Sequence, residues 1–194
     1  MSESWDDYAP GWDSNEAVIA YADKAHQALI QVMDPAGFRV LDFGCGTGLL
    51  SERLSPSAAS IVALDPAPKM IAVLENKGLS NVATITAGLD PKLAAEHPLL
   101  TPGFDLIVAS SALAFVPDYV ETVSLLKQLL KPGGRLIQWD WLKKQDDEGA
   151  GFSPHQIRSA MTAAGLVDCT VSTAFSVQAG GDKMDVLMGV ARNN

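Results

Sequence analysis

The sequence predicts an α/β fold in which a mainly parallel sheet is covered by helices on both faces. Short apolar segments alternate with longer segments of helical periodicity along most of the chain. The apolar segments are continuous, which is typical of strands buried on both faces. The last two expected strands, residues 166–175 and 184–191, are joined by a short turn containing Ala179–Asp182. Because parallel neighbours need a long crossover, this final pair is expected to be antiparallel.

The first expected element is an amphipathic helix. Residues 1–13 have no clear period, but apolar positions recur at helical spacing from Val18 to Met33. Ser14 or Asn15 is a suitable N-cap, and the Asp-Pro-Ala-Gly sequence that follows Met33 ends the helix.

Strands and helices then alternate. Five strands are expected before the final pair, at residues 39–43, 61–64, 82–86, 105–109 and 135–139. Helices are expected over residues 48–54, 68–78 and 118–130. Ser153 and Pro154 provide a cap and a first-turn proline for one more helix, which ends at Gly165.

Two of these strands carry the residues that point to a ligand. The segment Val40–Gly48 is apolar and then places glycines at alternate positions, and the next strand ends in Asp65. Glycines at such a turn leave room for a ligand against the backbone. Asp65 lies 21 residues after Gly44, near the spacing at which a carboxylate can accept hydrogen bonds from two ribose hydroxyls. The sequence therefore predicts a nucleoside site.

The turn differs from the one that binds dinucleotides. The dinucleotide pattern is G-x-G-x-x-G, whereas Gly44, Gly46 and Gly48 form G-x-G-x-G and are followed by Leu49. Asp42, two residues before the first glycine, would repel a pyrophosphate but suits an ammonium or sulfonium ligand.

These motifs resemble those of class I S-adenosylmethionine-dependent methyltransferases of the small-molecule type. Val40–Gly48 is similar to the first motif of that family, Asp65–Met70 to the second, Phe104–Ser110 to the fourth strand and Leu130–Leu136 to the turn into the fifth. The likeness extends over about residues 5–192. It implies a Rossmann-like, doubly wound sheet of seven strands in the order 3-2-1-4-5-7-6, with strand 7 antiparallel. A single domain over residues 1–194 is expected, with 1–33 as an N-terminal cap segment and helix and 38–194 as the core.

The resemblance also implies a cofactor site for S-adenosylmethionine. The backbone at Gly44–Gly46 would pass beneath the methionine part, Asp65 would hold the ribose, and Ser110 would lie near the methionine amine. Adenine would lie near Pro66, Met70, Leu89 and Asp90, although many relatives have an acid directly after a glycine, whereas here Leu89 comes between Gly88 and Asp90. Met70 could instead be a core residue and Asp90 only a turn residue before Pro91. The expected cofactor-binding residues are Asp42, Gly44, Cys45, Gly46, Gly48, Asp65, Pro66, Met70, Leu89, Asp90 and Ser110.

The candidates for an acceptor pocket are mainly aromatic. Trp139, Asp140 and Trp141 place two rings around an acid at the end of a strand, either as an apolar pocket with one fixed charge or as edge packing. The N-terminal rings either cap the ligand or attach that segment to the domain. Phe115 follows Ala114 where relatives often have histidine. The full set is Tyr8, Trp12, Tyr21, Phe115, Trp139, Asp140 and Trp141.

Composition excludes several kinds of partner. The 194 residues carry a formal charge of −9, so no basic face is expected for nucleic acid or an anionic membrane surface. No apolar run is long enough to span a membrane, and the first residues lack a signal-peptide pattern. Cys45 and Cys169 are expected to be reduced thiols in a cytoplasmic protein, without a metal site. Cys45 as a nucleophile is a sharper alternative to its role as a small turn residue.

The expected function is methyl transfer from S-adenosylmethionine to a small-molecule acceptor by in-line displacement. The chain lacks the N/D-P-P-Y/F/W and Pro-Cys motifs of methylases that act on nucleic-acid bases or glutamine. No catalytic residue is assigned, and the three histidines, His26, His97 and His155, are expected at the surface. The N-terminal segment is expected to cover the site. Two alternatives remain: a cofactor-binding regulator or partner subunit without turnover, and an NAD-dependent oxidoreductase, which the missing third glycine and Asp42 disfavour.

Overall fold

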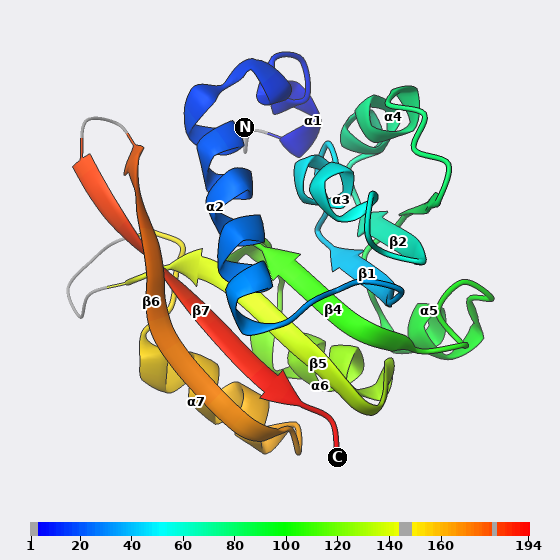
Figure 1. Ribbon diagram of the computed structural model, residues 1–194, viewed down its shortest axis with the longest axis vertical. Coiled ribbons are helices and arrows are strands. Elements are labelled where there is room, and N and C mark those ends of the chain that lie inside the picture. The colour runs from blue at the N-terminus through cyan, green and yellow to red at the C-terminus, as the bar shows by residue number, and fades with distance from the viewer. Residues whose placement is uncertain (1–3, 144–148, 180–181) are drawn as a thin grey trace.

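The computed structural model describes residues 4–143, 149–179 and 182–194. They form one seven-stranded sheet in the order β3-β2-β1-β4-β5-β7-β6 (Figure 1). Strands β1 to β5 are parallel to one another, and β7 is antiparallel to both β5 and β6. This confirms the expected fold class and strand order. The strands are β1 (Arg39–Phe43), β2 (Ser60–Asp65), β3 (Val82–Thr86), β4 (Phe104–Ser110), β5 (Leu130–Trp141), β6 (Val167–Ala179) and β7 (Asp182–Arg192).

Helices cover both faces of the sheet (Figure 1). The helices are α1 (Trp5–Tyr8), α2 (Glu16–Val32), α3 (Leu49–Leu54), α4 (Pro68–Asn76), α5 (Pro91–Glu96), α6 (Tyr119–Gln128) and α7 (Pro154–Ala163), with 3₁₀ turns η1 (Trp12–Ser14) and η2 (Leu113–Phe115). Helices α2, α3 and α4 lie on one face, and α5, α6 and α7 lie on the other.

Alternate residues of the central strands supply the two halves of the core. Val40 and Val108 are buried against α2 and α3, whereas Leu41 and Ile107 are buried on the opposite face. Because successive strand side chains point to opposite faces, continuous apolar strands fill both layers at once. Among the described residues, no helix has the length and apolar character needed to cross a membrane.

Helix starts are fixed by the caps that the sequence indicates. The Asn15 side chain accepts a 3.0 Å hydrogen bond from the Ala17 N–H at the start of α2. Ser153 and Gln156 form a reciprocal capping box at α7. These contacts satisfy backbone donors that have no partner within the helix.

Some elements differ from the sequence predictions. Strand β5 begins five residues before the expected Arg135, because the chain already pairs with β4 at Leu130. Helices α1 and α5 were not expected. They have four and six residues, which is too short for a helical pattern of apolar residues to repeat. The turn predicted at Ala179–Asp182 and the segment Lys143–Gly151 lie partly outside the described residues, since 144–148 and 180–181 are not described.

Candidate active site

A cavity of about 760 Å³ runs along the edge where the parallel strands end. Leu89 and Asp65 line it beyond β3 and β2, Gly44 and Ser110 beyond β1 and β4, and Trp141 at the end of β5. Strand order reverses between β1 and β4, which is where open α/β sheets bind ligands. The fold therefore brings residues far apart in the sequence into one continuous space.

Of the three glycines in the turn, only Gly46 has open space where a Cβ would lie. Gly44, Gly46 and Gly48 all have positive φ, at 66°, 54° and 78°. A Cβ at Gly46 would meet no atom within 4 Å, whereas one at Gly44 would overlap Ala112 and one at Gly48 would overlap Leu74. The prediction that all three glycines make room for a ligand is therefore corrected. Gly44 and Gly48 let the turn pack against the chain itself, and Gly46 leaves space in the cavity.

Asp65 is anchored to that turn by both of its carboxylate oxygens. Oδ2 accepts a 2.9 Å hydrogen bond from the Gly46 N–H, and Oδ1 accepts a 2.8 Å hydrogen bond from the Ala67 N–H. Burial raises the pKa of Asp65, and these two backbone donors oppose that effect. Each oxygen retains a further acceptor site. The carboxylate lines the cavity in a fixed orientation suited to a pair of hydroxyl donors.

Asp42 is a second buried acid on the cavity wall. It is 1% exposed, and its Oδ2 accepts a 2.6 Å hydrogen bond from the Ser51 hydroxyl on α3. Burial raises the pKa of Asp42 to about 6, the Ser51 hydroxyl lowers it, and the charge of Asp65 raises it. Among the described residues that line the cavity, the only charged side chains are these two acids. The site therefore favours a cationic group at this point and opposes an anion.

The expected adenine residues separate into two groups. Pro66, Met70 and Leu89 line the cavity, and Met70 is 2% exposed and also packs against Ala67. Asp90 is not among the lining residues. Its carboxylate accepts a 2.7 Å hydrogen bond from the Leu93 N–H and caps α5, which agrees with the alternative that it is a structural residue.

Cys45 lines the cavity as a small buried residue. Burial raises the pKa of its thiol well above 9, and the charges of Asp42 and Asp65 raise it further. The thiol is therefore protonated near neutral pH, the opposite of what a nucleophilic cysteine needs.

Residues 139–141 do not line one pocket. Trp139 is fully buried in the core beneath α2, while Trp141, on the same face of β5, reaches the cavity. Asp140 points to the other face, where its Oδ2 accepts a 2.9 Å hydrogen bond from the Gln138 side chain. Its Oδ1 has no hydrogen-bond partner among the described residues, and burial raises its pKa to about 8. Strand alternation explains this separation, so the pocket prediction is corrected for Trp139 and Asp140.

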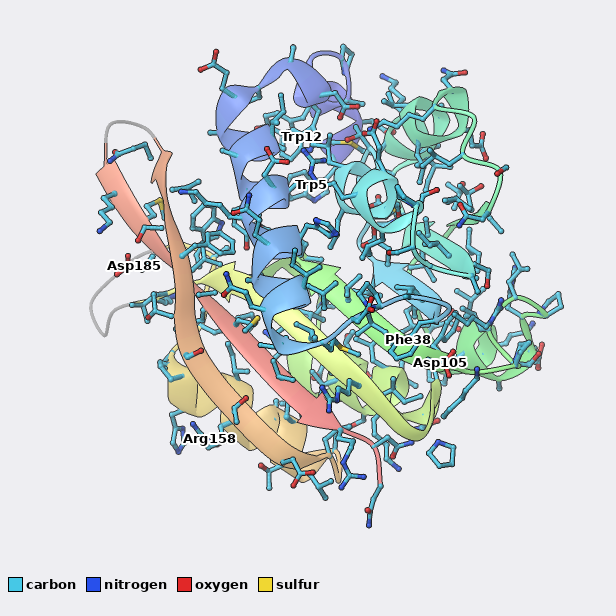
Figure 2. All side chains as sticks on the ribbon, in the orientation of Figure 1. Trp5, Trp12, Phe38, Asp105, Arg158 and Asp185 are labelled. Atoms are coloured by element: carbon cyan, nitrogen blue, oxygen red, sulfur yellow. The ribbon has the colours of Figure 1, made fainter. Side chains whose placement is uncertain are left out.

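The other aromatic candidates lie around the same cavity. Trp12, Tyr21 and Phe115 line it, together with Trp5. Tyr8 is not a lining residue and packs against the rings of Trp5 and Trp12, with centroid separations of 5.9 and 6.2 Å. Figure 2 shows Trp5 and Trp12 between α2 and the helices α3 and α4.

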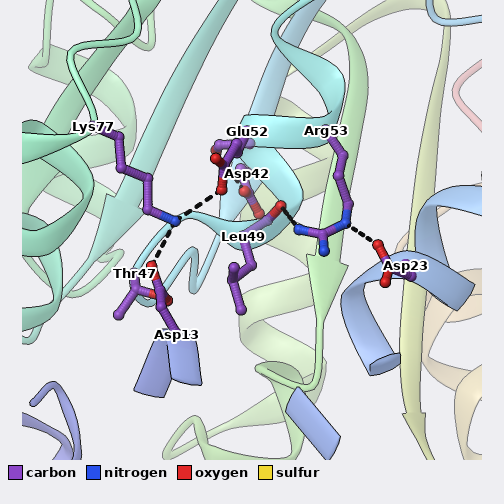
Figure 3. Close-up of polar contacts among 9 residues, drawn as sticks. Asp13, Asp23, Asp42, Thr47, Leu49, Glu52, Arg53 and Lys77 are labelled. Atoms are coloured by element: carbon purple, nitrogen blue, oxygen red, sulfur yellow. Dashed lines mark hydrogen bonds and ion pairs between the residues drawn. The ribbon is translucent and has the colours of Figure 1, made fainter. Parts of the chain in front are cut away.

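Acidic residues hold the N-terminal segment over the site. Asp6 accepts a 2.8 Å hydrogen bond from the Lys69 N–H at the start of α4. Asp13 accepts a hydrogen bond from the Thr47 hydroxyl in the glycine turn and lies 2.8 Å from the Lys77 Nζ (Figure 3). These contacts join residues 4–14 directly to α4 and to the glycine turn that carries Gly46.

Several lining residues escaped the sequence analysis. Val177 and Gln178 come from β6, whereas Ser111, with a φ of 54°, follows Ser110 at the edge where the sequence predicts the ligand. Ser51 fixes Asp42 from the next helix. The positive φ of Ser111 and the position of β6 depend on the assembled sheet, so no local pattern indicates them. Ser51 could have been predicted, because it lies in the first turn of the helix that follows the glycine turn and is therefore close to the end of β1.

The fold and the site together define a class I S-adenosylmethionine-dependent methyltransferase domain. A model of the family described as "Methyltransferase domain" matches residues 41–136, and the chain belongs to that family. The matched segment contains the glycine turn, Asp65 and Ser110.

Relatives and solved structures agree with this assignment. A ubiquinone biosynthesis O-methyltransferase from Xanthomonas oryzae pv. oryzae is 39% identical over 107 residues, which are 54% of this chain and 44% of that protein. The same enzyme from Xylella fastidiosa (strain 9a5c) is 42% identical over 104 residues, which are 53% of this chain and 41% of that protein. The chain thus matches less than half the length of these curated relatives.

The structural likeness covers nearly the whole chain. A methyltransferase structure from Aquifex aeolicus superimposes with a TM-score of 0.73 at 20% identity, covering 97% of this chain and 98% of the other. Magnesium protoporphyrin IX methyltransferase from Synechocystis PCC 6803, solved with bound S-adenosylmethionine, gives a TM-score of 0.66 at 21% identity, covering 90% of this chain and 79% of the other. These matches establish the fold.

Proposed function

We propose that this chain transfers a methyl group from S-adenosylmethionine to a small-molecule acceptor. The observation that carries the proposal is the single cavity that begins at Asp65 and the glycine turn and continues to Tyr21 and Trp141. One end has the polar groups for a nucleoside and the other has an apolar wall. The family is a methyltransferase family, which supports this function over the NAD-dependent alternative.

The residues present fit the cofactor. Gly46 leaves open space at the turn, Asp65 offers acceptor sites for the ribose, and Asp42 offers a negative charge for the methionine amine. Apolar contacts for adenine come from Pro66 and Met70. Leu89, Cys45 and Ser110 complete the wall that we assign to the cofactor.

The chemistry needs alignment and exclusion of water more than an acid or base on the protein. Bound S-adenosylmethionine supplies a methyl carbon whose bond to the acceptor forms as its bond to sulfur breaks, the sulfur keeping the electron pair and the acceptor proton passing to solvent. Trp5 and Trp12 roof the cavity and shield it from bulk water. We propose that residues 1–33 act as the cap of a single domain spanning residues 1–194.

The acceptor atom is proposed from the relatives. The curated relatives are O-methyltransferases, and the family model that matches this chain covers the glycine turn and Asp65. We therefore expect an acceptor that is methylated on oxygen. Its hydroxyl would lie beyond Ser110, on the side of Trp141.

A binding experiment tests the cofactor assignment. S-Adenosylmethionine and S-adenosylhomocysteine should raise the melting temperature, and NAD and ATP should not. Asp65→Ala should weaken S-adenosylhomocysteine binding at least tenfold by calorimetry, because hydrogen bonds to a charged acceptor contribute about 1.5–3 kcal/mol each. Asp118→Ala is the matched control, since Asp118 only caps α6. Equal affinity of wild type and Asp65→Ala would remove Asp65 from the site.

A turnover experiment tests the reaction. Incubation with S-adenosylmethionine and fractionated metabolite extract should release S-adenosylhomocysteine in at least one fraction. Tight cofactor binding with no turnover in any fraction would contradict the enzymatic assignment and favour a regulator or partner subunit.

A further inference from the structure

The residues assigned to the cofactor line only one end of the cavity, and the other end has no assigned ligand. Along the sheet edge, Leu89 and Asp65 lie beyond β3 and β2, and the glycine turn and Ser110 lie beyond β1 and β4. The cavity continues past these positions between α2 and the ends of β5 and β6. We call this part the α2 end; it is lined by Val18, Tyr21, Ala22, Ser111, Trp141, Val177 and Gln178.

The α2 end has flat aromatic walls. The rings of Tyr21 and Trp141 meet at a centroid distance of 5.1 Å and an angle of 65°. Tyr21 is held in turn by Phe175, at 5.3 Å and 86°. Val177 packs in the same buried cluster as Tyr21. Rings fixed by such edge-to-face contacts offer a planar compound a large apolar contact area without rearrangement.

Among the described residues, none of those that line the α2 end has a charged side chain. The two lining acids, Asp42 and Asp65, belong to the cofactor end, near the C-terminal ends of β1 and β2. A carboxylate or phosphate bound beside Tyr21 would lose its hydration and gain no cation. An ammonium would lose its hydration and find no ionised carboxylate in contact, because the nearest acid, Asp140, does not line the cavity and burial raises its pKa to about 8. An uncharged compound avoids this loss of ionic hydration.

One polar group at the α2 end lacks a well-formed hydrogen bond. Among the described residues, no partner lies at normal hydrogen-bond geometry to the Tyr21 hydroxyl, whose polar neighbour is the Ser111 hydroxyl, and Tyr21 is only 7% exposed. Burial raises the pKa of Tyr21 well above 10, the charge of Asp140 raises it further, and the Ser111 hydroxyl beside it lowers it. The hydroxyl is therefore protonated and able to donate. A buried donor without a well-formed hydrogen bond is costly, and a ligand oxygen entering beside Ser111 would complete the bond.

We propose that the α2 end binds an uncharged aromatic acceptor that carries a hydroxyl group, and that Tyr21 orients this group by hydrogen bonding to its oxygen. The inference rests on the proposed function, since it takes the other end of the cavity to be the cofactor site. It assigns Tyr21 as an acceptor-binding residue and Trp141 as the wall against which the acceptor ring lies.

The charge preference can be tested on the wild-type chain with four matched probes. These are 2-naphthol, 2-naphthoate, 2-naphthylmethylammonium and naphthalene, titrated into the full chain saturated with S-adenosylhomocysteine. Affinities come from NMR shifts of the tryptophan side chains, and the Trp141 signal reports the place of binding. We expect 2-naphthol to bind at least tenfold more tightly than either charged probe and to shift Trp141. Equal or tighter binding of the naphthoate or the ammonium probe would overturn the proposal.

The role of Tyr21 is tested with a pair of hydroxyl deletions. Tyr21→Phe should weaken 2-naphthol binding about fivefold, the effect of one hydrogen bond, and leave naphthalene binding unchanged. Tyr119→Phe is the matched control, because the Tyr119 hydroxyl donates to Gln138 and Tyr119 does not line the cavity. It should leave both affinities unchanged. Unchanged 2-naphthol affinity in folded Tyr21→Phe would contradict the orienting role.

The same titrations separate this inference from the proposed function. Saturation with S-adenosylhomocysteine is measured before any probe is added, and its failure would contradict both. Normal S-adenosylhomocysteine binding with no preference among the probes would contradict the acceptor assignment alone. The wild-type probe series decides the charge preference even if Tyr21→Phe does not fold.

Discussion

At the scale of single residues, the cofactor end depends on two buried acids held in different ways. Asp65 is fixed by backbone N–H groups of the turns around it, whereas Asp42 is fixed by one hydroxyl, that of Ser51. The pKa of Asp42, about 6, lies close enough to neutral pH for its charge to depend on that hydroxyl. Binding of a cationic ligand should therefore depend on pH.

The first prediction concerns this pH dependence. As pH falls through 6, Asp42 becomes protonated and its attraction for the amine of S-adenosylhomocysteine is lost. Affinity at pH 5 should be about tenfold weaker than at pH 7.5, measured by calorimetry. Ser51→Ala removes a hydrogen bond that lowers the pKa of Asp42, so its loss of affinity should begin at higher pH. An Asp42→Asn variant with the wild-type pH profile would show that Asp42 is not the responsible group.

The second prediction uses two glycines of the same turn. Gly46→Ala and Gly48→Ala both place an L side chain at positive φ, which costs about 1–2 kcal/mol in each case. Only the methyl group at residue 48 also overlaps Leu74. Gly48→Ala should therefore lower the melting temperature more than Gly46→Ala.

Their effects on binding should run in the opposite order. Gly46→Ala should lose more S-adenosylhomocysteine affinity, because its methyl group projects into the open space of the cavity. If Gly46→Ala bound the cofactor like wild type, the turn would serve only the fold.

Single residues also show what the sequence could predict. The acid at Asp65 was predictable because its spacing from the glycines follows from one strand-turn-helix-strand unit. The alternation of β5 correctly separates Asp140 from the two tryptophans, but it does not say which of Trp139 and Trp141 reaches the cavity. Which tryptophan reaches the cavity depends on how far α2 extends along the sheet, and this is set by tertiary packing.

At the scale of elements, local patterns predicted every strand and the longer helices. Strands β1 and β3 begin and end where expected, since apolar runs bounded by polar turns define them. Helix α5 was missed although Asp90 and Pro91 form the cap and first-turn proline of a helix start. The sequence analysis instead interprets Asp90 as an adenine neighbour or as a turn residue before Pro91.

The third prediction concerns the N-terminal segment. Residues 4–14 contribute Trp5 and Trp12 to the cavity and are held by Asp6 and Asp13. Deleting residues 1–13 should reduce methyl transfer sharply and weaken S-adenosylhomocysteine binding, because the roof that excludes water is lost. The sheet should stay folded, as seen in the far-ultraviolet circular dichroism spectrum. Equal binding and equal turnover by the truncated protein would make these aromatics packing residues only.

At the scale of the whole molecule, the site is a product of strand order. The order 3-2-1-4-5-7-6 places the turns after β1, β2 and β4 beside one another and brings β6 from the end of the chain next to α2. Composition and periodicity predicted a parallel sheet but not this order, which followed from the resemblance to methyltransferases. The packing of α2 against β6 brings together residues about 150 apart in the sequence. For example, the Lys24 Nζ donates a 2.5 Å hydrogen bond to the Ser176 carbonyl oxygen.

The most direct test of the account is a crystal structure of the full chain with S-adenosylhomocysteine. We predict that the ribose hydroxyls lie within hydrogen-bonding distance of Asp65, that the amine lies near Asp42, and that the sulfur points toward the α2 end without filling it. The Tyr21 hydroxyl should then face the remaining space. A complex in which the ligand lies outside this cavity, or in which its adenine occupies the α2 end beside Tyr21 and Trp141, would contradict the assignment of the two ends.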